Sequence, residues 1–139
     1  MQDFEDFVME SPDRTIGGAN YVDYDKPILE RMFQDLRMRW PFGRRHFDLH
    51  GTFYDWCEQH GVEVPVIEQP EDGTFKAGVR SSNARTDHIF GYCNLPPREK
   101  AHGALDNCEY TAEARHRLLH GKNFLPRFAE YELPKELTD

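Results

Sequence analysis

Apolar side chains recur at helical spacing in three stretches of the chain, residues 3–10, 25–36 and 103–119. One face of an α-helix repeats about every 3.6 residues, so this pattern predicts three amphipathic helices. Their apolar positions are Phe4, Phe7 and Val8; Ile28, Leu29, Met32, Phe33 and Leu36; and Leu105, Cys108, Ala112 and Leu119, joined by Ala104, Thr111 and Leu118. The stripe of the third helix is centred between Cys108 and Thr111.

Helix ends are marked by capping and breaking residues. Ser11-Pro12-Asp13 should end the first helix, and Asp25 suits the N-cap of the second, with Pro27 in its first turn. A short helix is predicted over residues 86–93, capped by Thr86 and stopped by Leu95-Pro96-Pro97.

Two short strands are expected between these helices. Residues 14–20 predict a strand that runs into a loop, and residues 45–53 predict a second strand, followed by a helix as far as Gln59 that Gly61 ends. Residues 62–84 predict a loop with a short hairpin around Glu71-Asp72-Gly73. Residues 123–139 predict a loosely held tail.

The composition fits one globular domain rather than a disordered chain, with 139 residues, 38% hydrophobic and 30% charged. No apolar run approaches the roughly 20 residues that cross a bilayer, and the acidic N-terminus lacks a basic and apolar leader. We therefore expect a cytoplasmic protein with no membrane partner. Cys57, Cys93 and Cys108 form no CxxC pair, so we expect reduced and mostly buried thiols.

The formal net charge of −8 argues against binding nucleic acid by charge alone, because such binding neutralises phosphates with Lys and Arg. It permits an enzyme that meets nucleic acid through bound metal ions, since a divalent ion reverses the field of the acidic groups around it. The candidate chemistry therefore has to come from particular carboxylates and histidines.

Two segments carry a recognisable arrangement. In residues 18–29, Asn20 ends a strand pattern, Tyr24 and Asp25 form an aromatic–acid pair, and Leu29 follows four positions later. In residues 102–113, His102 precedes Ala104-Leu105 and the polar positions Asp106 and Asn107, where a helix begins. In this order, the segments resemble the second and third motifs of the DEDDh-type 3′–5′ exonucleases, a family of the ribonuclease H-like superfamily.

The resemblance covers roughly residues 1–122 and implies the C-terminal portion of a ribonuclease H-like α/β exonuclease fold, a mixed sheet with flanking helices. It implies two divalent ions, Mg or Mn, which clamp the attacking and leaving oxygens of a phosphodiester. Asp25 would be a metal ligand, His102 the general base, and Asn20 and Tyr24 contacts to the substrate. The substrate would be the 3′ end of single-stranded DNA or RNA.

The chain departs from the family pattern in two places. The first motif, an Asp-x-Glu on a central strand, and the N-terminal strands are not in this sequence, so we expect a fragment, a split protein or a degenerate relative. A partner segment or self-association would then complete the sheet. At the third motif, Asn107 takes the place of the usual Asp metal ligand, and the helical wheel puts Asn107 at the edge of the apolar stripe, where a metal ligand belongs. Asp106 falls toward solvent and would be a metal ligand only if the helix start were shifted by a residue.

Other interpretations stay open at this stage. Asp25 suits a plain N-cap, His102 a surface or capping histidine and Asn107 an ordinary boundary residue, and Asp23 is the alternative second-motif carboxylate. The alternative functions are a noncatalytic nucleic-acid- or protein-binding relative with a degenerate metal site, and a zinc or manganese protein. The latter would use His46, Asp48 and His50, which alternate along a predicted strand. The aromatic residues are expected in the core, among them Phe33, Trp40, Phe42 and Trp56.

Overall fold

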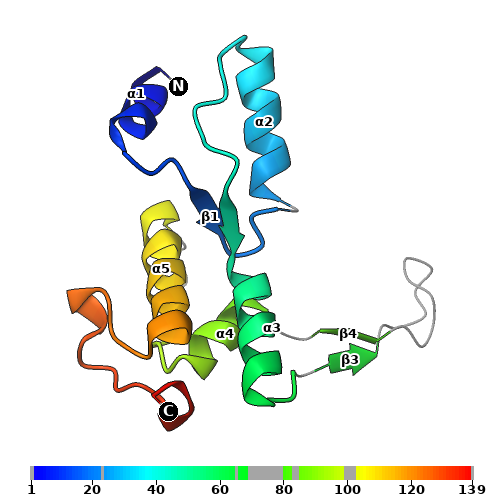
Figure 1. Ribbon diagram of the computed structural model, residues 1–139, viewed down its shortest axis with the longest axis vertical. Coiled ribbons are helices and arrows are strands. Elements are labelled where there is room, and N and C mark those ends of the chain that lie inside the picture. Colours follow the sequence, from blue (N-terminus) through cyan, green and yellow to red (C-terminus); the bar gives the residue numbers. More distant parts are fainter. Residues whose placement is uncertain are drawn as a thin grey trace. The chain divides into compact units, whose positions relative to one another are not determined.

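The computed structural model describes residues 2–22, 24–64, 66–68, 80–82, 85–98 and 103–138. The chain forms two compact units, Met1–Leu49 and His50–Asp139 (unit 1 and unit 2). Figure 1 shows a mixed α/β protein that is mostly helical, with one small parallel strand pair and one antiparallel strand pair. The expected α/β class is confirmed at this level, and the ribonuclease H-like topology stays a prediction.

Unit 1 is a βαβ unit preceded by a helix. Its elements are α1 (Gln2–Glu10), β1 (Ile16–Gly18), α2 (Asp25–Asp35) and β2 (His46–Asp48). The two strands are parallel and lie side by side (Figure 1), with Gly17 opposite Phe47 and Gly18 opposite Asp48. A Cβ atom at Gly17 would clash with the Phe47 ring, so the absence of a side chain there lets the ring lie across the strand.

Aromatic rings form the core of unit 1. Phe33 of α2 is buried, and its ring centroid lies 5.5 Å from Trp40 and 6.4 Å from Phe4 of α1. Phe42 lies 5.0 Å from Trp40 and 5.9 Å from Phe4. The predicted core position is confirmed for Phe33 and for Trp56, whereas Trp40 and Phe42 are only half-buried. The cluster joins α1, α2 and the segment that leads to β2.

Unit 2 is built mainly from helices. Its elements are α3 (Leu49–His60), which begins at the last residue of unit 1, β3 (Val66–Glu68), β4 (Arg80–Ser82), α4 (Thr86–Tyr92), α5 (Ala104–His120), and the 3₁₀ turns η1 (Pro126–Phe128) and η2 (Lys135–Leu137). β3 and β4 are antiparallel, which confirms a hairpin, although the predicted turn at 71–73 lies outside the described residues. The predicted second strand is shorter than expected, because β2 stops at Asp48 and α3 begins at once.

The buried face of α5 differs from the predicted apolar stripe. Leu105, Cys108 and Leu119 are exposed. Thr111 and Leu118 are buried as predicted, and the other buried positions are Tyr110, Glu113, Ala114 and Arg117. The stripe prediction was wrong at Leu105, Cys108 and Leu119, because the helix turns toward the core a face with a buried acidic and a buried basic side chain. A hydrophobic pattern counts such a pair as solvent-facing.

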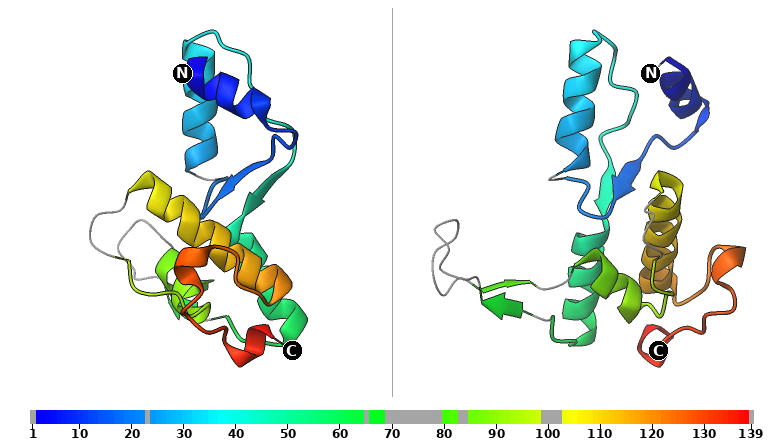
Figure 2. Two further views of the ribbon diagram at one scale, coloured as in Figure 1. Left: turned by 90° about the vertical axis from the view of Figure 1, so that its left-hand side faces the viewer. Right: turned by 180° about the vertical axis from the view of Figure 1, so that it is seen from behind.

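The segment after α5 is packed, so the prediction of a loosely held tail was wrong. Figure 2 shows it lying along α5, and Phe128 and Leu137 are buried. Two backbone N–H groups, those of Phe124 and Leu125, donate to the Glu113 carboxylate, the shortest bond being 2.7 Å from Leu125 to Oε2.

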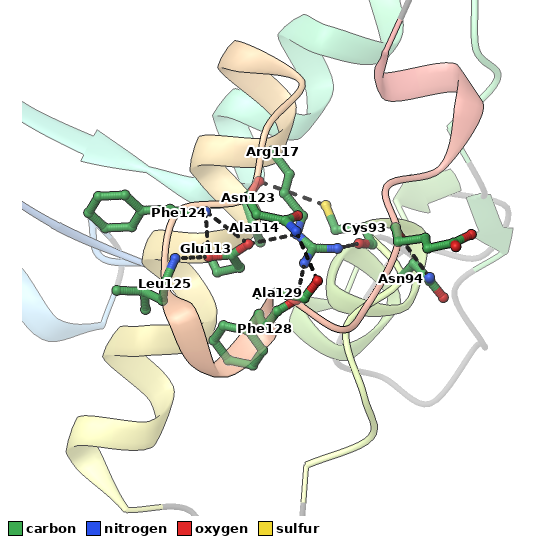
Figure 3. Close-up of polar contacts among 11 residues, drawn as sticks. Cys93, Asn94, Glu113, Ala114, Arg117, Asn123, Phe124, Leu125, Phe128 and Ala129 are labelled. Atoms are coloured by element: carbon green, nitrogen blue, oxygen red, sulfur yellow. Dashed lines mark hydrogen bonds and ion pairs between the residues drawn. The ribbon is translucent and has the colours of Figure 1, made fainter.

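Arg117 completes this junction from the same helix (Figure 3). Its Nε donates to Glu113 Oε1 at 2.8 Å, its Nη1 to the Cys93 carbonyl at 2.9 Å and its Nη2 to the Phe128 carbonyl at 3.1 Å. Glu113 and Arg117 are both fully buried. The pair, called the Glu113–Arg117 clamp below, holds the end of α4 and the C-terminal segment on α5.

The cysteines are free, and two of the three are buried, as predicted. Burial raises the pKa of the Cys93 thiol to about 12, with the nearby Arg117 charge opposing the effect. Among the residues described, no helix combines the length and the apolar composition needed to cross a membrane.

Candidate functional site at the end of the parallel strands

Two carboxylates of unit 1, Asp25 and Asp48, lie near the carboxyl ends of β1 and β2. Asp48 is the last residue of β2 and stands opposite Gly18, the last residue of β1. A Cβ atom built on Gly18 would lie 3.7 Å from Asp25 Oδ2. Residues paired in register project to the same face of a sheet, so the Asp25 carboxylate lies on the face that carries the Asp48 side chain. This edge is where open α/β sheets bind ligands.

The loop from β1 to α2 fixes the position of Asp25. Asn20 adopts a left-handed conformation with φ of 61°, and its carbonyl accepts the Tyr24 N–H at 3.3 Å. The Lys26 N–H donates to the Tyr21 carbonyl at 2.9 Å, and the Val22 N–H donates to Asp48 Oδ2 at 3.4 Å. Asn is among the few residues that tolerate this backbone conformation, so the sequence directly supports the loop.

The prediction that Asp25 is the N-cap of α2 was wrong. The cap position is Tyr24, which makes no side-chain capping bond, and Asp25 is the first helical residue. A carboxylate in the first turn is favoured by the partial positive charge of the helix N-terminus. Asp25 and Tyr24 are both exposed, so both can meet a ligand in solution.

Tyr21 lies beneath this edge. Its side chain is buried, and its hydroxyl has no hydrogen-bond partner among the described residues. Burial raises the pKa of the Tyr21 phenol, and the charges of Glu30 and Asp25 raise it further. The phenol therefore stays protonated at neutral pH.

The two carboxylates at this edge supply some, but not all, of the ligands that one Mg²⁺ or Mn²⁺ ion needs. Within the described ranges, no group of three His, Cys, Asp or Glu side chains is placed to hold a metal ion. Mg²⁺, however, is usually held by one or two carboxylates together with water and substrate phosphate oxygens. Asp25 and Asp48 supply that minimum, and the remaining ligands of a two-ion site would have to come from elsewhere.

The third-motif positions lie in unit 2 and are engaged by arginines. Asn107 Oδ1 accepts Arg98 Nη1 at 2.5 Å, and Arg98 also binds Asp87 Oδ1 through Nε at 2.9 Å and Nη2 at 2.6 Å. Asp106 pairs with Arg127 at 2.9 Å. The solvent-facing orientation predicted for Asp106 was wrong, because its side chain is only 28% exposed and is held by the C-terminal segment. The assignment of either residue as a metal ligand stays a prediction.

Two other predicted site residues, His102 and Asp23, lie outside the described residues, so the roles predicted for both stay untested. Asp25 belongs to unit 1, and Asn107 and Asp106 belong to unit 2.

The strand that was to align His46, Asp48 and His50 does not extend that far. His50 lies in the first turn of α3, where successive side chains turn by about 100° instead of alternating. Its Nε2 lies 3.1 Å from Thr86 Oγ1. His46 instead lies near the buried Tyr21, with ring centroids 6.1 Å apart. The alternation on which the predicted zinc or manganese site depended is therefore wrong.

A basic pocket in unit 1 was not predicted. It lies between α1 and the segment before β2 and has a volume of about 480 Å³. Four arginines line it: Arg14, Arg39, Arg44 and Arg45. The signal was present in the sequence, because three of these arginines fall within seven residues of a chain with a net charge of −8. The overall negative charge concealed this local excess of positive charge.

Comparisons with known proteins add no family assignment. No family model matches the chain, and neither the curated proteins nor the solved structures gave a match.

Proposed function

We propose that this chain supplies the second-motif part of a metal-dependent 3′–5′ exonuclease of the DEDDh type, acting on single-stranded DNA or RNA. The observation that supports the proposal best is the placement of Asp25, whose carboxylate stands at the carboxyl end of β1, on the face that carries Asp48. The resemblance assigns the metal-ligand role to the same residue.

In the proposed reaction, the residues of this edge would mainly position a metal ion and the terminal nucleotide. A bound Mg²⁺ or Mn²⁺ would neutralise charge on the scissile phosphate and lower the pKa of an attacking water. Asp25 and Asp48 would hold the ion. Asn20 and Tyr24 border the same edge and would contact the terminal nucleotide. The resemblance assigns the role of general base to His102.

A partner completes the proposed enzyme. On α2, Ile28, Met32 and Leu36 follow each other at intervals of four residues, and all three are exposed. Residues at that spacing share one face of a helix, so they form an apolar row. We assign this row, and the edges of the strand pair that no described strand covers, to a partner segment that also brings the acidic first motif, or to a second copy that covers the same surface.

The direct test is a nuclease assay on the whole chain with Mn²⁺ and a 5′-labelled single-stranded oligonucleotide. Only slow stepwise shortening from the 3′ end is expected, because this chain lacks the carboxylates of the first motif, and a 3′-terminal phosphorothioate should block it. Asp25→Asn should abolish shortening. Asp35→Asn is the matched control, since Asp35 lies at the other end of α2 and pairs with Arg31 on the surface.

Calorimetric Mn²⁺ titration supplies a second readout. The Asp25→Asn and Asp48→Asn variants should each lose metal affinity, while Asp35→Asn should not. Equal Mn²⁺ affinity in wild type and Asp25→Asn would refute the proposed site. The noncatalytic alternative is favoured by one observation, the engagement of Asn107 by Arg98. Retained Mn²⁺ binding without any shortening would support that alternative against the exonuclease.

A further inference from the structure

The basic pocket of unit 1 concentrates positive charge in an acidic chain. Its lining contains four arginines against two carboxylates, Glu5 and Asp13, which gives a local net charge of +2 where the chain as a whole has −8. Arg39, Arg44 and Arg45 are exposed, so their guanidinium groups are accessible to a ligand. A stable excess of cations in one concavity favours an anionic ligand.

The acidic residues of the lining are already engaged. Asp13 Oδ1 accepts the Thr15 N–H at 2.9 Å and the Thr15 hydroxyl at 2.6 Å. Glu5 also has an interaction within the chain. Of the arginines, Arg14 donates to the Met9 sulfur at 3.3 Å, a weak acceptor that leaves its charge uncompensated. The structure gives no ion pair for Arg39 or Arg44 within the described residues.

Aromatic rings form the other part of the lining. Trp40 and Phe42 are half-buried, and they pack edge to face against each other with centroids 5.0 Å apart. Phe33 supports Trp40 from behind at 5.5 Å. Rings held in place in this way, beside arginines, are the combination with which proteins bind single-stranded nucleic acid, because the cations follow the backbone and the rings stack on bases.

We propose that this pocket binds the phosphodiester backbone of a single-stranded nucleic acid, with a base against Trp40. The inference rests on the proposed function for its substrate class, and it adds a binding site that does not use metal. A volume of about 480 Å³ is of the size that holds one nucleotide and is too small for a duplex. The arginines hold the strand by charge, which requires no metal ion.

The test measures binding of a fluorescent oligothymidylate by anisotropy in EDTA, where no metal chemistry occurs. Arg44→Ala and Arg39→Ala should each weaken binding by roughly tenfold at low salt. Each should also reduce the slope of log affinity against log salt by about 0.7. Arg31→Ala is the matched control, because it removes the same charge from the same unit at a surface pair with Asp35. An equal loss in Arg31→Ala would overturn the assignment to the pocket.

A base contact is tested separately by tryptophan fluorescence. In a Trp56→Phe background only Trp40 emits, and oligothymidylate should quench it while polyphosphate should not. Polyphosphate that binds as tightly as the oligonucleotide, without quenching in either case, would show a charge-only site and overturn the proposal. A duplex of the same sequence should bind more weakly than the single strand, and stronger duplex binding would also contradict it.

The outcomes separate this inference from the exonuclease proposal. Wild-type binding that depends on Arg44, without cleavage in Mn²⁺, would refute the enzyme and leave the pocket. Cleavage that depends on Asp25, with unchanged affinity in Arg44→Ala and Arg39→Ala, would refute the pocket and leave the enzyme.

Discussion

Units 1 and 2 use charged side chains in opposite ways. In unit 2, Glu113 and Arg117 are fully buried, and their polar atoms bind each other, two N–H groups and two carbonyls of the backbone. In unit 1, Asp25 and the arginines at 39, 44 and 45 are exposed. Buried charges with every partner supplied organise a fold, whereas exposed charges that converge on an edge or a pocket are available to a ligand. Ligand binding is therefore expected in unit 1, and most of the charge-dependent stability in unit 2.

The largest effect should come from breaking the clamp. Glu113→Ala would leave Arg117 buried without its carboxylate and remove the acceptor of the Phe124 and Leu125 N–H groups. We expect a loss of about 3–5 kcal/mol in the free energy of unfolding, measured by urea denaturation. The double variant Glu113→Leu/Arg117→Met should recover part of this loss. A change below about 1 kcal/mol in Glu113→Ala would contradict the organising role of the clamp.

A backbone clash gives the next effect. Gly121 ends α5 with φ of +57°, and a Cβ there would strike the Leu137 carbonyl. Gly61 ends α3 with φ of +65°, and a Cβ there would meet no atom of the described residues within 4 Å. Gly61→Ala should cost about 1 kcal/mol for the left-handed backbone alone, and Gly121→Ala about 2 kcal/mol or more. Equal decreases in melting temperature in the two variants would show that the Leu137 carbonyl does not pack closely against Gly121.

Alkaline pH should weaken unit 2 through Cys93. Its pKa is about 12 in the folded chain against 9.0 for a solvent-exposed cysteine thiol, with burial as the first cause. The folded state therefore holds the proton more tightly, and the stability from this group is complete below pH 9 and lost as the pH rises toward about 12. Above pH 9, the loss should approach about 1.4 kcal/mol per pH unit. Cys93→Ala should flatten this dependence, and Cys108→Ala, at an exposed position, should leave it unchanged.

The smallest effects on stability should come from the exposed groups of unit 1. Asp25→Asn and Arg44→Ala should each change the free energy of unfolding by less than about 0.5 kcal/mol, because surface substitutions remove few interactions. The same two variants should lose Mn²⁺ affinity and oligonucleotide affinity respectively. A destabilisation above about 2 kcal/mol in either variant would show that the charged side chain stabilises the fold, and it would contradict the proposed difference between units 1 and 2.

The sequence predicted the positions of the helices well because local signals determine them. The apolar spacing of residues 25–36 and the breakers around α4 act over one or two turns, and α2 and α4 lie where they were expected. The length of β2 was not predictable in this way, because Leu49-His50-Gly51 has no breaker that separates a strand from a helix.

The orientation of α5 was mispredicted for a different reason. Hydrophobic periodicity predicts that Glu113 and Arg117 face solvent. In the structure they are buried, because they form an ion pair with each other and hydrogen bonds with backbone groups up to 24 residues away. Such a pair can be recognised only when the distant partners are known. The candidate site was also predictable only in part. The loop at Asn20 and the position of Asp25 at the start of α2 follow from local sequence. The position of Asp25 near the strand edge that carries Asp48 depends on the register of the two strands, which local sequence does not determine.

The clamp also has a practical consequence for anyone who shortens this protein. Residue 122 looks like a natural end when only the helix pattern is considered, since α5 has just finished there. Cutting at that point would strip Glu113 of both amide donors and Arg117 of one carbonyl, and would uncover the side chains that Phe128 and Leu137 now shield. Recombinant versions should therefore keep residues 123–138. If a shortened chain precipitates, the cause is the loss of this segment and not the chemistry of the candidate site.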